Sequence, residues 1–474
     1  MAIARSTLGD AVITRLERLV APHNVCTEEH MVRPYVVDGM APAALVLPES
    51  DDDVAAVVRV AVEEKLGVIP VGHGSKLAMG MPPVRYDIAL GLFHLNRVVA
   101  YDPDDLTLSV EPGIPLARLA QQLAQHKQWL PLAVPFTTQT TVGGAIASGV
   151  DSPLRQGYGT ARDYVLGVEY VSGLGELAKS GGRVVKNVSG YDLHKAFIGS
   201  LGTLGVITRV NFRTFPVLAA VRGFIASFPT AEAALALQRR IVATSLQPVT
   251  LEVISPELAR IFAAGTPRHL GEDVDEPGEW FSTSAWTVAA GFGGNPAIIE
   301  RHARDLTRLA TEAGGGGLRV LDDTERPTVW GRLRECLAML LEASPAAVIM
   351  KASAPPAKSP ELIAKLYAAA QEQGLPAAAL VRAVGVTYFA LLPTDWNDDV
   401  ATRLAAACDR AFDAAGQCGG HAVIPFCPTM LKQRIRVGGS VWGPPREDAP
   451  LMRKLKGVFD PHGIFSPGRL VGGI

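Results

Sequence analysis

Residues 186–208 read KNVSGYDLHKAFIGSLGTLGVIT, and this stretch constrains the fold more than any other. It holds four glycines and ends in an apolar run. Because glycine has no Cβ, such a backbone can come close to something large and flat. The candidate contacts in this stretch are Gly202, Gly205, Val206 and Ile207.

A second glycine-rich loop lies upstream, after two expected strands. Residues 43–48 read as a short buried strand, Ser50 begins a helix that ends near Gly67, and residues 68–71 form the second strand. The loop that follows permits positive φ, and its N–H groups can surround a pyrophosphate. Its spacing fits neither the G-x-G-x-x-G nor the G-x-x-x-x-G-K-[ST] motif. The candidate contacts are Val71, Gly72, His73, Gly74, Ser75 and Lys76, which adds a positive charge.

A third such segment, residues 135–149, lies between the other two. Its Thr-Val-Gly-Gly run is expected to begin a short helix, whose free N–H groups suit an anion or a carbonyl oxygen. Taken alone, a tight loop in a compact core explains this segment equally well. The candidate contacts are Pro135, Thr140, Thr141, Gly143 and Gly144, with Asp163 further along.

The composition indicates a folded protein of more than one domain. The 474 residues are 48% hydrophobic and carry a formal net charge of −2. Lysines and arginines are dispersed among acids, which argues against nucleic-acid binding. No apolar run reaches the roughly 20 residues that span a bilayer, and the N-terminus does not resemble a signal peptide. We expect a cytoplasmic protein with no transmembrane segment.

The five cysteines form no C-x-x-C pair. Scattered reduced thiols are therefore expected. The spacings of ten and nine residues between the last three are unlike an iron–sulfur or zinc framework. An iron–sulfur centre would then belong to another chain. The cysteines are Cys26, Cys336, Cys408, Cys418 and Cys427.

Three parts are expected along the chain. Residues 1–216 mix strands and helices in two lobes, with a hairpin over 97–111. Residues 217–427 alternate long helices with strands, which suggests helices on one face of an antiparallel sheet. Residues 428–474 contain FDPHGIFSPGRL at 459–470, where prolines restrict φ and glycines free it. In the middle part we expect helices at 231–244, 296–313 and 359–373 and strands at 250–254, 286–291, 347–351 and 386–392.

These segments resemble the FAD-linked oxidases of the vanillyl-alcohol oxidase and para-cresol methylhydroxylase (PCMH) superfamily. Residues 70–75 fit its P-x-G-x-G-[ST] loop, and KNVSGYDL is most similar to the FAD-binding subunits of bacterial glycolate oxidases. The resemblance implies an α+β fold: a two-lobed PCMH-type FAD-binding domain, a cap domain with an antiparallel sheet, and a C-terminal tail that returns to the flavin domain. It also implies that the sixteen candidate contacts named above hold FAD, and it assigns Lys186 and Asn187 to the adenine-side loop.

The resemblance also bears on how the cofactor is attached. In members with covalent FAD, a histidine follows the paired glycines, where this chain has Ser75. His73 lies two residues earlier. We expect FAD to be held non-covalently.

The implied reaction is oxidation of a 2-hydroxy acid such as glycolate or D-lactate to the 2-oxo acid. Complete members hold a divalent metal with a His-x-x-x-x-x-x-His pair and an acidic residue, and we expect no such site here. The resemblance then implies a metal-bearing FAD subunit and an iron–sulfur subunit as partners, a quinone beyond them, and a peripheral place at the inner membrane through those partners. A self-contained flavin dehydrogenase is the alternative, and a scaffold without flavin is a further one.

Four other side chains have competing interpretations. Tyr191 could approach the flavin or pack as a structural aromatic, and His194 is expected to cap a helix or face solvent. Arg434 and Arg436 could bind a carboxylate. A solvated or partner-facing role is the alternative for both arginines.

Overall fold

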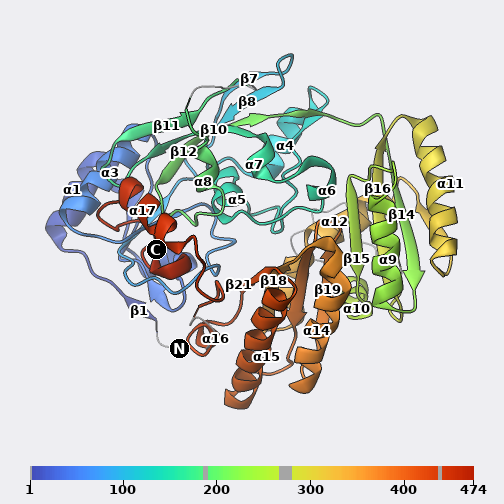
Figure 1. Cartoon of the computed structure of the whole chain (residues 1–474). Coiled ribbons are helices and arrows are strands. Elements are labelled where there is room, and N and C mark those ends of the chain that lie inside the picture. Colours follow the sequence, from blue (N-terminus) through green and yellow to red (C-terminus); the bar gives the residue numbers. More distant parts are fainter. Residues whose placement is uncertain (1–2, 185–189, 266–279, 436–439) are drawn as a thin grey trace.

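The computed structural model describes residues 3–184, 190–265, 280–435 and 440–474. Lys186, Asn187 and Arg436 lie outside the described residues. Three larger sheets organise the described chain (Figure 1). Two of them make up the lobes before residue 217, and the third belongs to the middle part.

The first lobe is a small sheet with the strand order β2-β4-β6-β5. β4 and β5 both pair with β6 in parallel, and α3 connects them. The Ser50 Oγ accepts the N–H of Asp53 and so begins α3, as expected. The helix ends at Glu63, before the expected end near Gly67. Its elements are β1 (Ala4–Arg5), α1 (Asp10–Val20), β2 (Val25–Cys26), α2 (Glu29–Val32), β3 (Met40–Ala41), β4 (Ala44–Val46), α3 (Asp51–Glu63), β5 (Val68–Val71) and β6 (Ile88–Gly91).

The second lobe is an antiparallel sheet with the strand order β11-β10-β12-β8-β7. The expected hairpin forms as β7 and β8. Buried side chains of β8, β10 and β12 form one core with α4 and α5. Its elements are β7 (Val98–Asp102), β8 (Thr107–Val110), α4 (Leu116–Ala124), β9 (Gln128–Trp129), α5 (Val142–Ser148), α6 (Arg155–Tyr158), α7 (Ala161–Tyr164), β10 (Val165–Val171), β11 (Leu177–Gly181), α8 (His194–Phe197), β12 (Val206–Arg213) and β13 (Phe215–Pro216).

The middle part is built on an eight-stranded antiparallel sheet with the order β17-β14-β16-β15-β19-β20-β18-β21. The expected strand at 250–254 matches β15, and the other expected helices and strands agree to within a few residues. Its elements are β14 (Ala220–Phe228), α9 (Ala231–Val242), β15 (Thr250–Ile254), α10 (Pro256–Ala264), β16 (Trp286–Gly294), α11 (Pro296–Glu312), β17 (Leu318–Leu321), α12 (Glu325–Arg334), α13 (Cys336–Ala343), β18 (Val348–Ser353), α14 (Ser359–Glu372), β19 (Ala377–Arg382), β20 (Val386–Leu391), α15 (Asp398–Gln417) and β21 (His421–Phe426).

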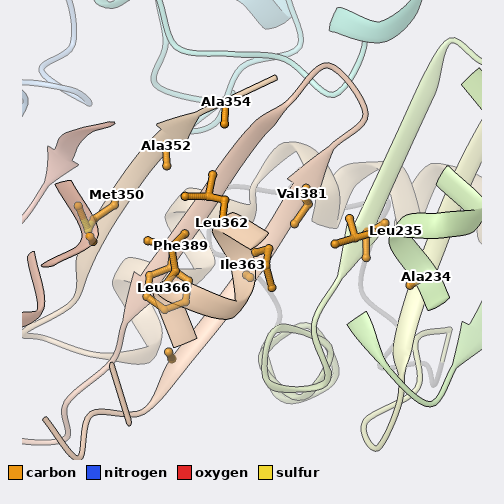
Figure 2. Close-up of a cluster of buried hydrophobic side chains, with 14 of the residues drawn as sticks. Ala234, Leu235, Met350, Ala352, Ala354, Leu362, Ile363, Leu366, Val381 and Phe389 are labelled. Atoms are coloured by element: carbon orange, nitrogen blue, oxygen red, sulfur yellow. The ribbon is translucent and has the colours of Figure 1, made fainter. Parts of the chain in front are cut away.

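Both faces of this sheet are covered, so the expectation of helices on one face was wrong. The long helices α9, α11, α14 and α15 pack on one face, where Leu362 and Leu366 lie near Phe389 (Figure 2). α10, α12 and α13 cover the other face, together with Met79 and Phe136 of the lobes. Along the central strands, successive apolar side chains point to opposite faces of the sheet and so belong to two cores. The apolar pattern of a helix does not show which of these faces the helix covers.

The C-terminal tail returns to the first lobe, as expected. It contains α16 (Thr429–Lys432) and α17 (Ala449–Phe459), and the chain ends close to α17 (Figure 1). Val68 of β5 donates its N–H to Ile464 O at 2.8 Å and accepts the N–H of Ser466 at 2.8 Å. The tail thereby extends the first sheet next to the glycine loop. The α+β fold with a returning tail is confirmed.

Candidate functional site

The glycine loop after β5 lies directly against the start of α5. A Cβ on Gly72 would come within 2.4 Å of Thr141 Oγ1, so only glycine permits this approach. Gly74 has a φ of +81°, which also favours glycine. The loop and the helix start therefore form one continuous wall.

Glycine also shapes the start of α5 itself. Thr141 caps the helix by accepting the N–H of Gly144 at 3.3 Å. A Cβ on Gly143 would lie 2.6 Å from the Pro112 side chain, whereas one on Gly144 would meet only Thr141 Oγ1, at 3.3 Å. Gly143 is needed for packing, and Gly144 leaves room in front of the helix.

The third glycine segment faces the other two across two adjoining cavities. Gly202 has a φ of +69°, and a Cβ on Gly205 would lie 2.8 Å from Val171 O. β12 begins directly afterwards, at Val206. The predicted residues that line the cavities are Val71, Gly72, His73, Gly74, Ser75, Lys76, Thr141, Gly143, Gly144, Gly202, Gly205 and Ile207.

Four predicted contacts do not line these cavities. Pro135 and Thr140 lie just behind the wall, where Thr140 Oγ1 bonds the Pro135 carbonyl at 3.1 Å. Asp163 accepts the N–H of Thr160 at 2.7 Å and forms a capping box at α7. Val206 is buried in the core of the first lobe. The structure thus gives Asp163 and Val206 local structural roles.

Several cavity residues were not among the predicted contacts. Arg469 reaches in from the tail, Gln139 precedes α5 and Ser148 is its last residue. Gln139 and Arg469 stood in motifs that the sequence singled out, so proximity to the glycines was their available signal. Pro70, Ala147, Ser148 and Leu201 also stand in these segments, whereas nothing local marks Leu77, Leu92 and Pro112.

The residues present fit FAD. The cavity walls are backbone of three glycine-bearing segments, which lets a dinucleotide come close. Ser466 Oγ, from the tail, is buried beside Gly202 with no hydrogen-bond partner among the described residues. That each predicted contact touches FAD stays a prediction.

Lys76 is the cation of the glycine loop. Its Nζ donates to Thr140 Oγ1 at 2.5 Å and to Ser75 Oγ at 3.1 Å. Burial lowers the pKa of Lys76 to about 7, against the opposing influence of Glu335. The side chain is therefore poised to take up a proton when an anion binds beside it.

We expect FAD to bind Lys76 in its protonated form, so that affinity falls as the pH rises above about 7. The pyrophosphate favours the ammonium and raises its pKa, which makes binding take up a proton between the free and bound pKa values. The loss of FAD affinity approaches about tenfold per pH unit in that window, because one pKa unit corresponds to about 1.4 kcal/mol. Fluorescence titrations of the apoprotein with FAD at several pH values measure this.

The control for this prediction is Lys76→Met, which keeps an apolar stem and removes the titration. Its FAD affinity should be lower at neutral pH and should not change with pH in the same window. A wild-type affinity that is constant from pH 7 upward would contradict the role of Lys76.

Glu335, between α12 and α13, ties the sheet domain to the segment in front of α5. This fully buried carboxylate accepts the N–H of Phe136 at 2.6 Å and the Thr137 hydroxyl at 2.5 Å. Phe136 has a φ of +60°, so the bonds hold a strained backbone. The ring of Phe136 lies 5.4 Å from Lys76 Nζ. The cavity wall is thus anchored from the other domain.

A buried group of charged residues begins three residues after the cavity, at Asp151. Asp151 Oδ2 lies 2.7 Å from Arg155 Nη1 and 3.3 Å from Lys351 Nζ of β18. Burial raises the pKa of Asp151, but the neighbouring cations outweigh it and hold the pKa below its usual value. Deeper in, Glu252 Oε1 lies 2.6 Å from Arg382 Nη1. The interface between the lobes and the sheet therefore contains buried charges beside its apolar contacts.

Neither histidines nor cysteines form a metal site in the described residues. No group of three His, Cys, Asp or Glu side chains there could hold a metal ion. His23 and His30 have the spacing of the His-x-x-x-x-x-x-His pair, which we did not expect to find in this chain. Both side chains are exposed on the first lobe. All five cysteines are free thiols.

Three further expectations can be compared with the structure. Tyr191 is 89% exposed, so it is not a packed aromatic. His194 is buried and its N–H donates to Ser180 Oγ at 2.9 Å, so it does not face solvent. Arg434 pairs with the exposed Asp398 at 2.7 Å, as a solvated side chain would.

None of the helices in the described ranges is long and apolar enough to cross a membrane.

The model of the FAD binding domain matches residues 42–181. The model of the C-terminal domain of FAD linked oxidases matches residues 219–443 and 445–470.

Curated relatives match along most of the chain. Glycolate oxidase subunit GlcD of Bacillus subtilis is 24% identical over 90% of this chain and 89% of its own length. Glycolate oxidase subunit GlcE of Escherichia coli is 27% identical over 87% of this chain and 95% of its own length. D-lactate dehydrogenase of Anaerostipes hadrus is 29% identical over 64% of each chain.

The fold is shared with solved structures. p-Cresol methylhydroxylase with bound substrate superposes with a TM-score of 0.75 and 18% identity, over 99% of this chain and 98% of that one. Alkyldihydroxyacetonephosphate synthase gives a TM-score of 0.74 at 20% identity, over 99% and 88%. Since the two family models cover both halves of the chain, it belongs to the FAD-linked oxidases and its cofactor is FAD.

Proposed function

We propose that this chain is an FAD-binding subunit of a 2-hydroxy-acid dehydrogenase that oxidises glycolate or D-lactate to the 2-oxo acid. The observation that carries the proposal is the likeness to two glycolate oxidase subunits, each along nearly its whole length. A D-lactate dehydrogenase among the relatives supports the same substrate class. Bound FAD supplies the two-electron redox chemistry, and the protein supplies binding, orientation and electrostatics.

The contribution of the chain is to hold the cofactor without a covalent bond. The three glycine segments take the dinucleotide, and the remaining predicted contacts support them. Ser75 stands where covalent members have histidine. The ring of His73 lies 6.0 Å from that of Phe93, against which it tilts. The domain bounds we propose are 1–216 for the FAD-binding domain, 217–427 for the cap and 428–474 for the returning tail.

We further propose that the chain works in a complex. Two of the relatives that match along most of the chain are subunits by name. The partners would be a metal-bearing FAD subunit and an iron–sulfur subunit, which passes electrons to a quinone. The complex would account for a peripheral location at the inner membrane.

A self-contained dehydrogenase is the second candidate, and the buried charges favour it. Arg155 and Lys351 share the carboxylate of Asp151, which follows α5 in the chain by three residues. Such cations suit a substrate carboxylate. The reaction would then need no other flavoprotein.

The test separates the two candidates. The tagged chain is purified alone with FAD and also isolated with its partners from its own cells, and both samples receive glycolate or D-lactate without air. We expect the flavin absorbance to bleach only in the complex, together with formation of the 2-oxo acid. Rapid bleaching of the chain alone would favour the self-contained enzyme. A flavin-loaded complex that reacts with neither acid would refute the proposed function.

A further inference from the structure

A cavity of about 440 Å³ opens between the second lobe and the sheet domain. It lies at the ends of β18 and β21 and at the turn between β19 and β20. Arg155 of α6, in the second lobe, and Lys351 of β18, in the sheet domain, line it together with His421. The volume is within the usual range of small-molecule sites.

The charges around this cavity are not balanced. Asp151 is the shared partner of the two lining cations, but only 4% of its side chain is exposed. Arg155 and Lys351 expose 30% and 24% of theirs. The carboxylate thus lies beneath the cations, and the cations face the cavity.

Further charged side chains surround this cavity. Arg446 acts on His421 from the tail and is paired with Asp448 at 2.9 Å. Arg382 is paired with Glu252 behind the wall. Burial raises the pKa of Glu252 to about 7, against the opposing influence of Arg382. In and around the cavity, four cationic side chains are therefore accompanied by three carboxylates.

Buried polar atoms next to the cavity also lack partners. Thr387 Oγ1, Arg382 Nε and Glu252 Oε2 have no hydrogen-bond partner among the described residues. Each belongs to a residue that is at most 5% exposed. Buried donors and acceptors of this kind are ordinarily satisfied, by protein, water or ligand.

We propose that this cavity binds the carboxylate of a small organic acid, with Arg155 and Lys351 as the cations that hold it. Guanidinium and ammonium groups with a shared, buried counter-ion remain available to a second carboxylate. The choice of a 2-hydroxy acid as the natural ligand rests on the proposed function.

The probe is oxalate, an unreactive dicarboxylate, titrated calorimetrically into the FAD-loaded chain. We expect Lys351→Met to weaken oxalate binding by about tenfold or more, the size expected for loss of one charge-assisted contact. Lys358→Met is the matched control, because Lys358 is exposed and pairs with Glu361 on the surface. It should bind oxalate like the wild type.

A second pair of variants leaves the buried charges untouched. Gly419 lines the cavity with a φ of +73°, and a Cβ there would meet nothing within 4 Å. Asparagine and aspartate both tolerate such a φ. Gly419→Asp should weaken oxalate binding severalfold through like-charge repulsion, and Gly419→Asn should not.

The outcomes decide the proposal independently of the proposed function. Unchanged oxalate affinity in both Lys351→Met and Gly419→Asp would overturn it, as would a wild type that binds inorganic phosphate as tightly as oxalate. FAD content and melting temperature show that each variant is folded. If the variants lose oxalate while the complex reacts with no hydroxy acid, the site stands and the proposed function fails. If the complex reacts and the variants bind oxalate normally, the carboxylate site is refuted and the proposed function stands.

Discussion

Replacing Gly144 by alanine is expected to weaken FAD binding by about tenfold or more, which is about 1.4 kcal/mol. A Cβ at this position would project into the cavity, with only Thr141 Oγ1 nearby at 3.3 Å. It would occupy the space through which a cofactor approaches the start of α5. The apoprotein should keep its melting temperature or gain slightly, because alanine favours a helix over glycine by about 0.5–1 kcal/mol.

Equilibrium titration of the apoprotein with FAD measures this loss, and a thermal melt without FAD tests the fold. The matched control is Gly457→Ala in α17, where a Cβ would also meet nothing within 4 Å. It should bind FAD like the wild type. Equal FAD affinity in Gly144→Ala and Gly457→Ala would show that the cofactor does not lie against α5.

The second large effect concerns stability. Glu252→Ala should lower the free energy of unfolding by about 3–5 kcal/mol, since it leaves a buried cation without its partner. Glu252 and Arg382 lie 2.6 Å apart with side chains 1% and 6% exposed. Urea unfolding, followed by circular dichroism above pH 7 where Glu252 is ionised, measures the loss.

An exposed pair provides the comparison. Asp305 pairs with Arg301 on the surface of α11, at 3.7 Å, so Asp305→Ala should cost less than about 1 kcal/mol. The double variant Glu252→Leu with Arg382→Met should be more stable than Glu252→Ala, because no unpaired charge remains. A loss below about 1 kcal/mol in Glu252→Ala would contradict the importance of this buried pair.

Much of the fold could be predicted from local patterns. The helix start at Ser50, the hairpin of β7 and β8 and the strand β15 all follow from short-range spacing of polar and apolar residues. The glycine segments were recognisable because a backbone that must approach another surface tolerates no Cβ. Gly72 beside Thr141 is such a case.

Other features depend on parts of the chain that are far apart. Nothing near Pro112 or Leu92 marks them as cavity residues, because they reach the cavity only through the packing of the lobes. Asp163 looked like a cofactor contact, yet its carboxylate caps α7. The coverage of both sheet faces was likewise invisible, because an apolar strand residue looks the same whichever core it faces.

The residues alone were enough to identify the three glycine segments, the returning tail and the family to which they belong, because these depend on local backbone requirements. The pairing of Asp151 with Lys351, of Glu252 with Arg382 and of Glu335 with residues 136 and 137 could be found only in the folded chain. Charged side chains carry no mark of their partners in the sequence. Burial and distance set the strength of these ion pairs and hydrogen bonds and the pKa values of the charged groups. Both arise only when the sheet domain packs against the two lobes.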